Sequence, residues 1–135
     1  MTKKTYHGSC HCGAIKYEAD IDLAQGTGRC NCSFCQKSRA WTAFVKPDAF
    51  RLLSGANEAV GYHRHDAAPL KFTCRICGVR THGTGDADYM GGPFVSVFVS
   101  TLDDATDAEL AAAPVRYADG RNNNWQNAPG ETRHL

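Results

Sequence analysis

Seven cysteines carry the clearest chemical signal in this sequence, because they fall into three tight clusters. In chain order the clusters are a C-x-C pair, a C-x-C-x-x-C triplet and a C-x-x-C pair: Cys10 and Cys12, then Cys30, Cys32 and Cys35, then Cys74 and Cys77. Thiolates separated by one or two residues can bind the same metal ion if the backbone turns between them. Gly8, Gly13 and Gly78 lie beside the first and third clusters and permit such turns. The spacing therefore indicates metal binding.

The number of cysteines divides naturally into four and three. Zinc prefers four ligands in a tetrahedron, with sulfur at about 2.3 Å, so one cysteine pair cannot close a site and two pairs can. The triplet Cys30, Cys32 and Cys35 supplies three thiols from one short segment, which leaves the two pairs to form a four-cysteine site. A closed four-cysteine site is structural, whereas three thiolates leave a position open for water or substrate. We therefore expect one closed structural site and one open site of the kind in which catalytic zinc is usually presented.

Three other interpretations of the cysteines remain open at this point. The thiols could be inert core residues, or the pair at Cys74 and Cys77 could be a redox motif, although no βαβ pattern surrounds it. The triplet could also bind a second structural zinc with one histidine as the fourth ligand. The candidate histidines are His7, His11, His63, His65 and His82. His63 and His65 are alternatively candidates for a general base.

Length and composition are those of an ordinary globular domain. The chain has 135 residues, and we expect one domain over residues 1–135, with a core of about 5–125 and a polar C-terminal tail. The formal charge of +1 argues against a nucleic-acid surface and against a polybasic membrane patch. No apolar run approaches the ~20 residues of a membrane span, and no apolar segment follows the charged N-terminus as in a signal peptide. These features, with an odd number of cysteines, predict a cytoplasmic protein with reduced thiols.

The elements that must position the cysteines are mostly strands. Alternating or β-branched apolar residues predict strands over 14–19, 41–45, 50–53, 59–65, 70–73, 79–84 and 94–101, the last of them central. Short helices are expected over 34–39, capped by Ser33, and over 103–110, ending before Pro114. We expect a loop over 20–28, a turn over 119–124, and a polar remainder with Trp125 as its anchor. This pattern predicts an all-β fold, mainly β with one or two short helices, whose small sheets are held at one end by metal.

The arrangement of the motifs resembles the glutathione-dependent formaldehyde-activating enzyme family, which has a zinc-binding fold called the β-tent. The matching segments are Gly8–Tyr17, Cys30–Cys35, Phe72–Gly78, Thr101–Asp104 and Ala118–Arg121, and together they span roughly residues 5–125. A single cysteine pair is a weak signal, but three clusters in this order and spacing are a strong one. Gln36 departs from the family, where relatives often have an arginine after the third cysteine of the triplet.

The resemblance implies a function for each cluster. Cys10, Cys12, Cys74 and Cys77 would hold a structural zinc, and Cys30, Cys32 and Cys35 would hold a labile catalytic zinc. The family's reaction joins glutathione and formaldehyde into S-hydroxymethylglutathione, formally a carbon–sulfur lyase step, so the partners would be a small-molecule thiol and an aldehyde. Two alternatives are a related lyase with another thiol or carbonyl substrate, and a non-enzymatic zinc-stabilised binding module, since the family includes centromere-associated proteins.

Glutathione carries two carboxylates, which Arg and Lys side chains bind well. Arg29, Lys37 and Arg39 bracket the triplet and are the candidate glutathione contacts. Trp41 and Phe44 could line a groove, although we expect both to pack in the core. The sequence carries no signal for the oligomeric state.

Overall fold

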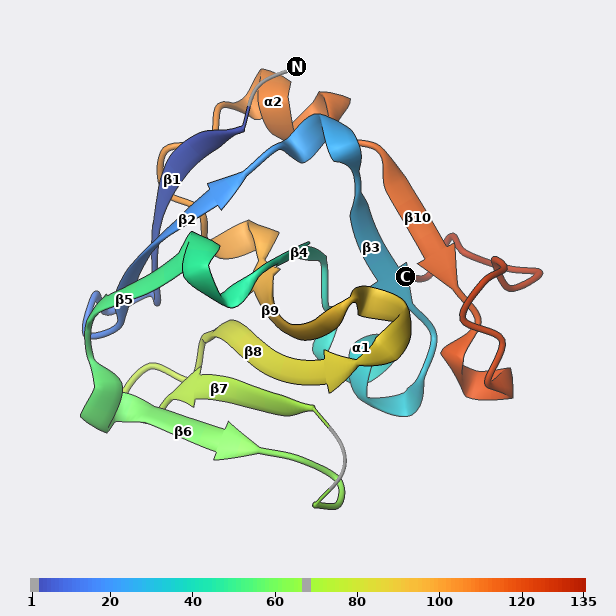
Figure 1. Cartoon of the computed structure of the whole chain (residues 1–135), viewed down its shortest axis with the longest axis horizontal. Coiled ribbons are helices and arrows are strands. Elements are labelled where there is room, and N and C mark those ends of the chain that lie inside the picture. The colour runs from blue at the N-terminus through green and yellow to red at the C-terminus, as the bar shows by residue number, and fades with distance from the viewer. Residues whose placement is uncertain (1–2, 67–68) are drawn as a thin grey trace.

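A computed structural model describes residues 3–66 and 69–135 (Figure 1). Residues 1–2, which belong to the N-terminal segment that we compared with a signal peptide, lie outside the described residues, as do residues 67–68. The described residues form ten strands in two sheets, with two short α-helices, which confirms the predicted all-β class. Within these residues no helix is both long and apolar enough to cross a membrane.

The smaller sheet has three antiparallel strands in the order β1-β2-β5, which span Lys4–Ser9, Lys16–Ile21 and Phe50–Ser54. Strand β2 alternates buried and partly exposed side chains, because Tyr17, Ala19 and Ile21 face the core. Strand β1 was not predicted. Its residues are mostly polar, and only Tyr6 and Gly8 are buried, so the hydrophobic alternation is too short to recognise.

The larger sheet has seven strands. Their order is β10 (Val115–Ala118), β3 (Thr27–Cys30), β4 (Thr42–Val45), β9 (Gly92–Phe98), β8 (Arg80–Ala87), β7 (Leu70–Cys74) and β6 (Ala59–Tyr62). All neighbours are antiparallel except β10 and β3, which are parallel. Strand β9 is central, as predicted, although it ends at Phe98 because a 3-10 turn occupies Val99–Thr101.

The predicted loop over residues 20–28 is partly wrong. It contains the end of β2, a 3-10 turn over Leu23–Gln25 and the start of β3. Strand β3 has no apolar alternation, and its parallel partner β10 lies far along the chain, where no strand was predicted. Thr27 fixes this pairing, since its hydroxyl donates to the Pro114 carbonyl at 2.9 Å and accepts from Nε1 of Trp41 at 2.7 Å.

The two α-helices lie close to their predicted positions but begin differently. Helix α1 spans Ser33–Ser38, and its N-cap is Cys32, not Ser33, because the Cys32 sulfur accepts the backbone N–H of Cys35. Helix α2 spans Asp107–Ala112 and begins at a capping box formed by Thr106 and Glu109. The remaining 3-10 turns span Pro47–Ala49, Ala56–Glu58, Asp88–Met90 and Gly120–Asn122.

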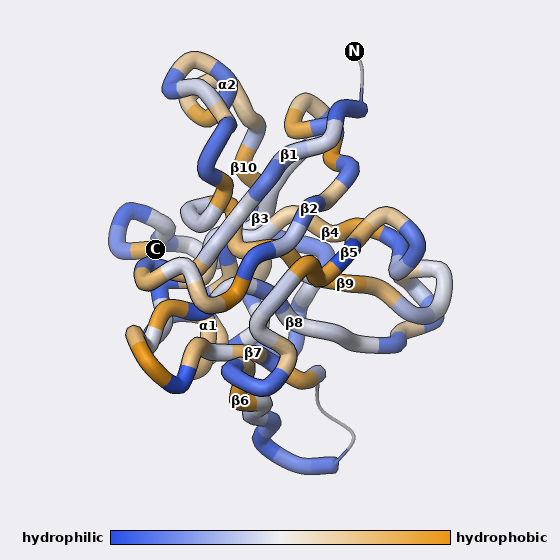
Figure 2. Tube along the Cα trace, turned by 90° about the vertical axis from the view of Figure 1, so that its left-hand side faces the viewer, coloured by the Kyte–Doolittle hydropathy of each residue, from blue (hydrophilic) through white to orange (hydrophobic). Residues whose placement is uncertain are grey.

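The main core lies between the two sheets. It gathers the inward faces of β1, β2 and β9: Tyr6, Tyr17, Ala19, Ile21, Val95 and Val97 are all buried there. Figure 2 shows the hydrophobic stretches of β4 and β9 in the middle of the trace. A second, smaller cluster packs Cys10, Ile15 and Cys74 together at one end of the sheets. The packing therefore brings the first and third cysteine clusters to the same place.

Candidate metal centres and substrate cleft

The four cysteines of the first and third clusters lie together in space. The sulfur atoms of Cys10, Cys12, Cys74 and Cys77 all lie within 4.8 Å of one another. The Sγ–Sγ distance is 3.7 Å both for Cys10 with Cys12 and for Cys12 with Cys74. Four sulfurs at 2.3 Å from a central ion form a tetrahedron whose edges measure about 3.8 Å. The donor set and its spacing therefore fit zinc.

Glycines make the turns that aim these sulfurs at one point. Gly13 and Gly78 have φ angles of 81° and 80°, which side chains strongly disfavour. The Gly78 N–H donates to the Cys74 carbonyl at 2.9 Å, which closes the turn after β7. Gly8 acts differently from the prediction, because it lies in β1 under the ring of Tyr17 and leaves space for that ring.

Backbone N–H groups point at the sulfurs of this cluster. Ile15 donates to Sγ of Cys10 at 3.3 Å, and Ile76 donates to Sγ of Cys74 at 3.4 Å. Backbone hydrogen bonds from Cys12 and Val79 lower the pKa of Cys77 to about 6. Such donors stabilise thiolates, which are the form that binds metal. Cys10 and Cys74 are buried, so the cluster joins the small sheet to β7 from the inside.

The triplet forms a second cluster at the start of α1. The sulfurs of Cys30, Cys32 and Cys35 lie within 4.8 Å of one another, and all three residues are half-buried. Cys30 ends β3, Cys32 caps α1 and Cys35 lies in its first turn. The Cys32 N–H donates to Sγ of Cys30 at 3.3 Å. Among the described residues no His, Asp or Glu joins these three sulfurs, so the protein offers three ligands there and leaves one position open.

The three thiols of the triplet differ in how readily they lose a proton. The pKa of Cys32 is lowered to about 2, because the Cys30 and Cys35 thiols and the N–H groups of the first helical turn donate to its sulfur. The pKa of Cys35 is raised by its hydrogen bonds to Cys30 and Cys32 and by burial. One thiolate is thus favoured without metal, and a divalent cation would favour all three.

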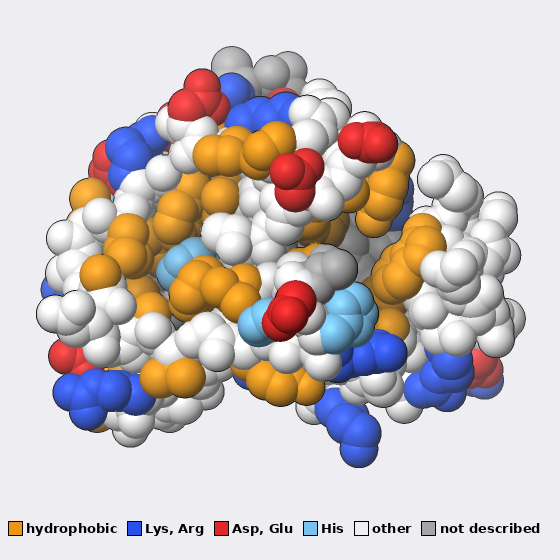
Figure 3. Space-filling model, turned by 60° about the horizontal axis from the view of Figure 1, so that its bottom comes forward, with side chains coloured by type: hydrophobic (Ala, Val, Ile, Leu, Met, Phe, Trp, Pro, Cys, Tyr) orange, Lys and Arg blue, Asp and Glu red, His pale blue; other side chains and the backbone are white. Residues whose placement is uncertain are grey.

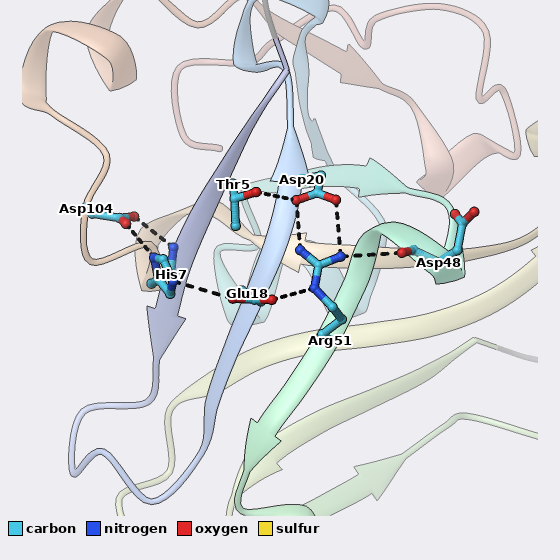
Figure 4. Close-up of polar contacts among 7 residues, drawn as sticks. All are labelled: Thr5, His7, Glu18, Asp20, Asp48, Arg51 and Asp104. Atoms are coloured by element: carbon cyan, nitrogen blue, oxygen red, sulfur yellow. Dashed lines mark hydrogen bonds and ion pairs between the residues drawn. The ribbon is translucent and has the colours of Figure 1, made fainter.

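The histidines considered as a fourth ligand lie elsewhere. His82 is buried between the rings of Phe50 and Phe72, with centroid distances of 4.7 and 4.9 Å, and burial lowers its pKa to about 4. Figure 4 shows His7 between Asp104 and Glu18 on the outside of β1 and β2. The ring Nδ1 of His63 lies 2.6 Å from the His65 carbonyl, beyond the end of β6, and His11 is exposed. The described structure brings none of them into the triplet.

Of the three predicted glutathione contacts, Lys37 lines a cleft beside α1. The cleft has a volume of about 320 Å³ and is lined by Ser33, Phe34, Lys37, Ser38, Tyr62, Arg64 and Arg80. Arg29 lies over the ring of Trp41 at 5.0 Å, and Nη1 of Arg39 donates to the His134 carbonyl at 3.2 Å. Trp41 packs against the core as expected, but Phe44 is 51% exposed, so the expectation of a buried Phe44 was wrong.

Sequence reasoning missed two cations beside the triplet. The Lys71 ammonium and the Arg80 guanidinium lie 4.9 and 4.5 Å from the centre of the Phe34 ring. Burial lowers the pKa of each, and the charge of the Cys35 thiolate opposes that shift. Both residues flank the third cysteine cluster in the sequence. That flanking position is the one signal in the sequence, but only the pairing of β7 with β8 and the contacts with Phe34 show that both cations lie beside α1.

The C-terminal segment forms a wall beside the triplet. Asn31 donates to Asp119 at 2.8 Å and accepts the backbone N–H of Arg121 at 3.0 Å. Arg121 in turn donates to Oε1 of Gln36 at 2.6 Å, so a guanidinium lies beside the residue that follows the third cysteine of the triplet. A Cβ atom added to Gly120 would meet both the Trp125 ring and Sγ of Cys30, which shows how closely this segment approaches the sulfurs.

Comparisons with known proteins agree with this arrangement. The family described as glutathione-dependent formaldehyde-activating enzyme matches residues 5–118. The crystal structure of a Rhodobacter sphaeroides protein is similar to this chain, with a TM-score of 0.67 and 27% sequence identity, and the match covers 82% of this chain and 99% of that chain. Because the family match covers most of the chain and includes all three cysteine clusters, the chain belongs to the glutathione-dependent formaldehyde-activating enzyme family.

Proposed function

We propose that this protein is a zinc-dependent carbon–sulfur lyase-type enzyme that joins glutathione and formaldehyde into S-hydroxymethylglutathione. Its family acts on formaldehyde with glutathione in general. The single observation that carries the finer proposal is the triplet, where three sulfurs converge and the described residues supply no fourth ligand. A module that used zinc only for stability would need the four-cysteine site alone. Reduced thiols persist in the cytosol, so the proposal places the enzyme there.

The two sites have different roles in this proposal. Cys10, Cys12, Cys74 and Cys77 hold a structural zinc, whose binding free energy is folding free energy, on the order of 10–16 kcal/mol in small zinc peptides. Cys30, Cys32 and Cys35 hold the catalytic zinc. Three protein ligands with an open fourth position hold an ion less firmly than four ligands in a closed site, so this second zinc is the labile one.

The reaction forms one bond and moves one proton. The glutathione sulfur, as thiolate, attacks the formaldehyde carbon, so a C–S bond forms and the C=O π electrons move to oxygen. That oxygen then takes a proton, which balances the proton lost by the thiol. Zinc held by Cys30, Cys32 and Cys35 would supply the chemistry that lowers the pKa of a nearby thiol and polarises an aldehyde oxygen.

The residues of the chain prepare this step. N–H donors hold the sulfurs of Cys30 and Cys32 in place, so the ligands are ordered before substrate arrives. The segment from Gly120 to Trp125 limits access on one side of the triplet. The cations near Phe34 lie on another side, where the carboxylates of glutathione need partners.

The proposal is tested by exchange spectroscopy with ¹³C-formaldehyde and glutathione at equilibrium. The uncatalysed addition proceeds in buffer, so the expected result is exchange faster than the buffer rate with zinc-loaded protein. Cys32→Ser should fold, retain about one zinc per chain and return exchange to the buffer rate. If zinc-loaded wild-type protein leaves exchange at the buffer rate, the non-enzymatic binding module becomes the better explanation. Acceleration with a different thiol but not with glutathione would favour a related lyase.

A further inference from the structure

The cleft beside α1 collects positive charge. Lys37, Arg64 and Arg80 line it, and Lys71 packs on the Phe34 ring that the cleft shares. Figure 3 views the molecule from the side of β6 and β7 and shows Lys and Arg side chains next to hydrophobic and histidine side chains on that face. These cations come from three separate segments, α1, the residues after β6 and the β7–β8 pair, which the fold brings to one place.

None of these four cations has a carboxylate within 4.0 Å in the described part of the chain. Three arginines elsewhere in the described residues are paired with acids. Arg51 binds Glu18 and Asp20, Arg75 binds Glu58, and Arg133 binds Glu131, and Figure 4 shows the first of these networks. Four cations without an acid partner therefore gather at this cleft, where they repel one another unless an anion is present.

Arg80 is held in a fixed orientation. Its Nε donates to the Thr73 hydroxyl at 3.0 Å, and its guanidinium lies over the Phe34 ring. In the described residues its two Nη nitrogens have no hydrogen-bond partner. A planar guanidinium that is packed on one face and free at its fork matches a carboxylate in two parallel hydrogen bonds. Arg80 is also half-buried, so an unpaired charge there costs free energy that an anionic ligand would offset.

The cleft and the triplet share one helix. Phe34 directly precedes Cys35 in α1, and Lys37 lies about one helical turn after Phe34. An extended tripeptide spans roughly 10 Å, so its carboxylates can lie in the cleft while its sulfur lies near the triplet. We infer that the Phe34 cleft is the carboxylate subsite of the thiol substrate, with Arg80 as the bidentate anchor and Lys37 and Arg64 as outer contacts. This inference rests on the proposed function, and it makes negative charge on the substrate the basis of selection.

The inference is tested by calorimetry with S-methylglutathione, which keeps both carboxylates and has no free thiol to bind metal. Arg80→Gln should weaken its binding roughly tenfold to hundredfold, the range for losing hydrogen bonds between charged groups. Lys37→Gln, on the exposed side of α1, should weaken binding by about twofold to fivefold. Arg116→Gln is the matched control. Arg116 is an exposed residue of β10 that does not line the cleft, and its side chain donates to the Gln25 carbonyl.

The diethyl ester of S-methylglutathione separates direct contact from a structural effect. The wild type should bind the ester weakly, and Arg80→Gln should change ester binding less than twofold. Equal losses for acid and ester in Arg80→Gln, or equal wild-type affinities for acid and ester, would overturn the inference. The inference would also be overturned if S-methylglutathione at millimolar concentration does not bind to the wild type. If Arg80→Gln does not fold, the double variant Lys37→Gln with Arg64→Gln serves the same comparison, with a combined loss of about tenfold expected.

The two proposals can fail independently. Formaldehyde exchange above the buffer rate, with no effect of Arg80→Gln on S-methylglutathione binding, would reject the subsite and keep the function. Charge-dependent binding at Arg80, with exchange at the buffer rate, would reject the enzyme and keep the anion cleft.

Discussion

His82 is an ionisable residue that the fold uses for packing. It lies buried in β8 between Phe50 and Phe72, and its Nδ1 is 2.9 Å from the Thr81 hydroxyl. Burial disfavours the charged ring, so the folded protein holds His82 neutral where an unfolded chain would protonate it. A histidine that is a candidate ligand in the sequence is thus an aromatic core residue in the structure.

The lowered pKa of His82 predicts a loss of stability in acid. The pKa is about 4 in the folded protein and 6.5 in the unfolded chain, so the unfolded state binds the proton first. Its contribution is complete above pH 6.5 and is lost as the pH falls toward 4, by roughly 3 kcal/mol in total. Urea unfolding of the wild type and His82→Phe at several pH values checks this. The His82→Phe variant should lose less unfolding free energy than the wild type between pH 6.5 and 4. If the unfolding free energies of the two proteins fall in parallel with pH, at equal zinc content, the prediction is wrong.

Single cysteines should separate the two proposed sites. Cys10→Ser removes a buried ligand and should abolish cooperative folding, since several kcal/mol of metal binding are lost. Cys32→Ser removes a half-buried ligand at the N-cap of α1, where serine is itself a favoured capping residue, so it should cost at most about 1 kcal/mol in stability. Thermal unfolding together with zinc content provides the comparison. A Cys32→Ser protein that unfolds as severely as Cys10→Ser would refute the division of roles.

At the scale of elements, the position of the triplet depends on the parallel pairing of β3 with β10. The pairing places Cys30 opposite Ala118, directly before the turn that approaches the sulfurs. Thr27 and Trp41 anchor the start of β3 through hydrogen bonds that involve one buried hydroxyl. The triplet is therefore supported by residues from distant parts of the chain.

Thr27→Val should weaken this support. The change keeps the shape but leaves Nε1 of Trp41 without its partner, so we expect a loss of about 1–3 kcal/mol in unfolding free energy. Trp41→Phe and the double variant complete a thermodynamic cycle measured by urea unfolding. If the two single losses simply add, the hydroxyl and the indole do not interact in the way the structure shows.

The strands that sequence analysis found are those with a local pattern. The run from Phe94 to Phe98 alternates apolar residues on both faces, and β2 alternates Tyr17 and Ala19 with polar residues. Strand β3 carries no such pattern, and β10 alternates over only three residues, which is too short to recognise, whereas their parallel pairing joins distant parts of the chain. The cysteine grouping was predictable because ligand number and spacing constrain it strongly. The role of Arg80 was not predictable from the sequence, since it depends on which strands lie beside α1.

At the scale of the whole molecule, the four-cysteine cluster joins two sheets that otherwise meet mainly through the hydrophobic core. It lies at one end of the sheets, whereas the triplet lies on α1, on a different part of the larger sheet. The two proposed zinc ions should therefore be lost with different consequences for the fold.

A chelator should remove zinc in two phases. The ion at the half-buried triplet should leave first without change in far-ultraviolet circular dichroism, because its ligands come from one local segment. The second ion should leave slowly and together with unfolding, since Cys10 and Cys74 are buried. Zinc release and circular dichroism recorded in parallel check this. A single phase in which all zinc and all structure disappear together would contradict it.

The four-cysteine cluster also constrains how the chain is made. About 65 residues separate Cys12 from Cys77, and a ribosome adds them in roughly 3–13 s at 5–20 residues per second. During that interval Cys10 and Cys12 lack the other two sulfurs of the proposed zinc site, so their thiols are open to oxidants and to competing metals. A cell short of zinc or under oxidative stress would therefore damage nascent chains at Cys10 and Cys12 before it harmed the finished protein.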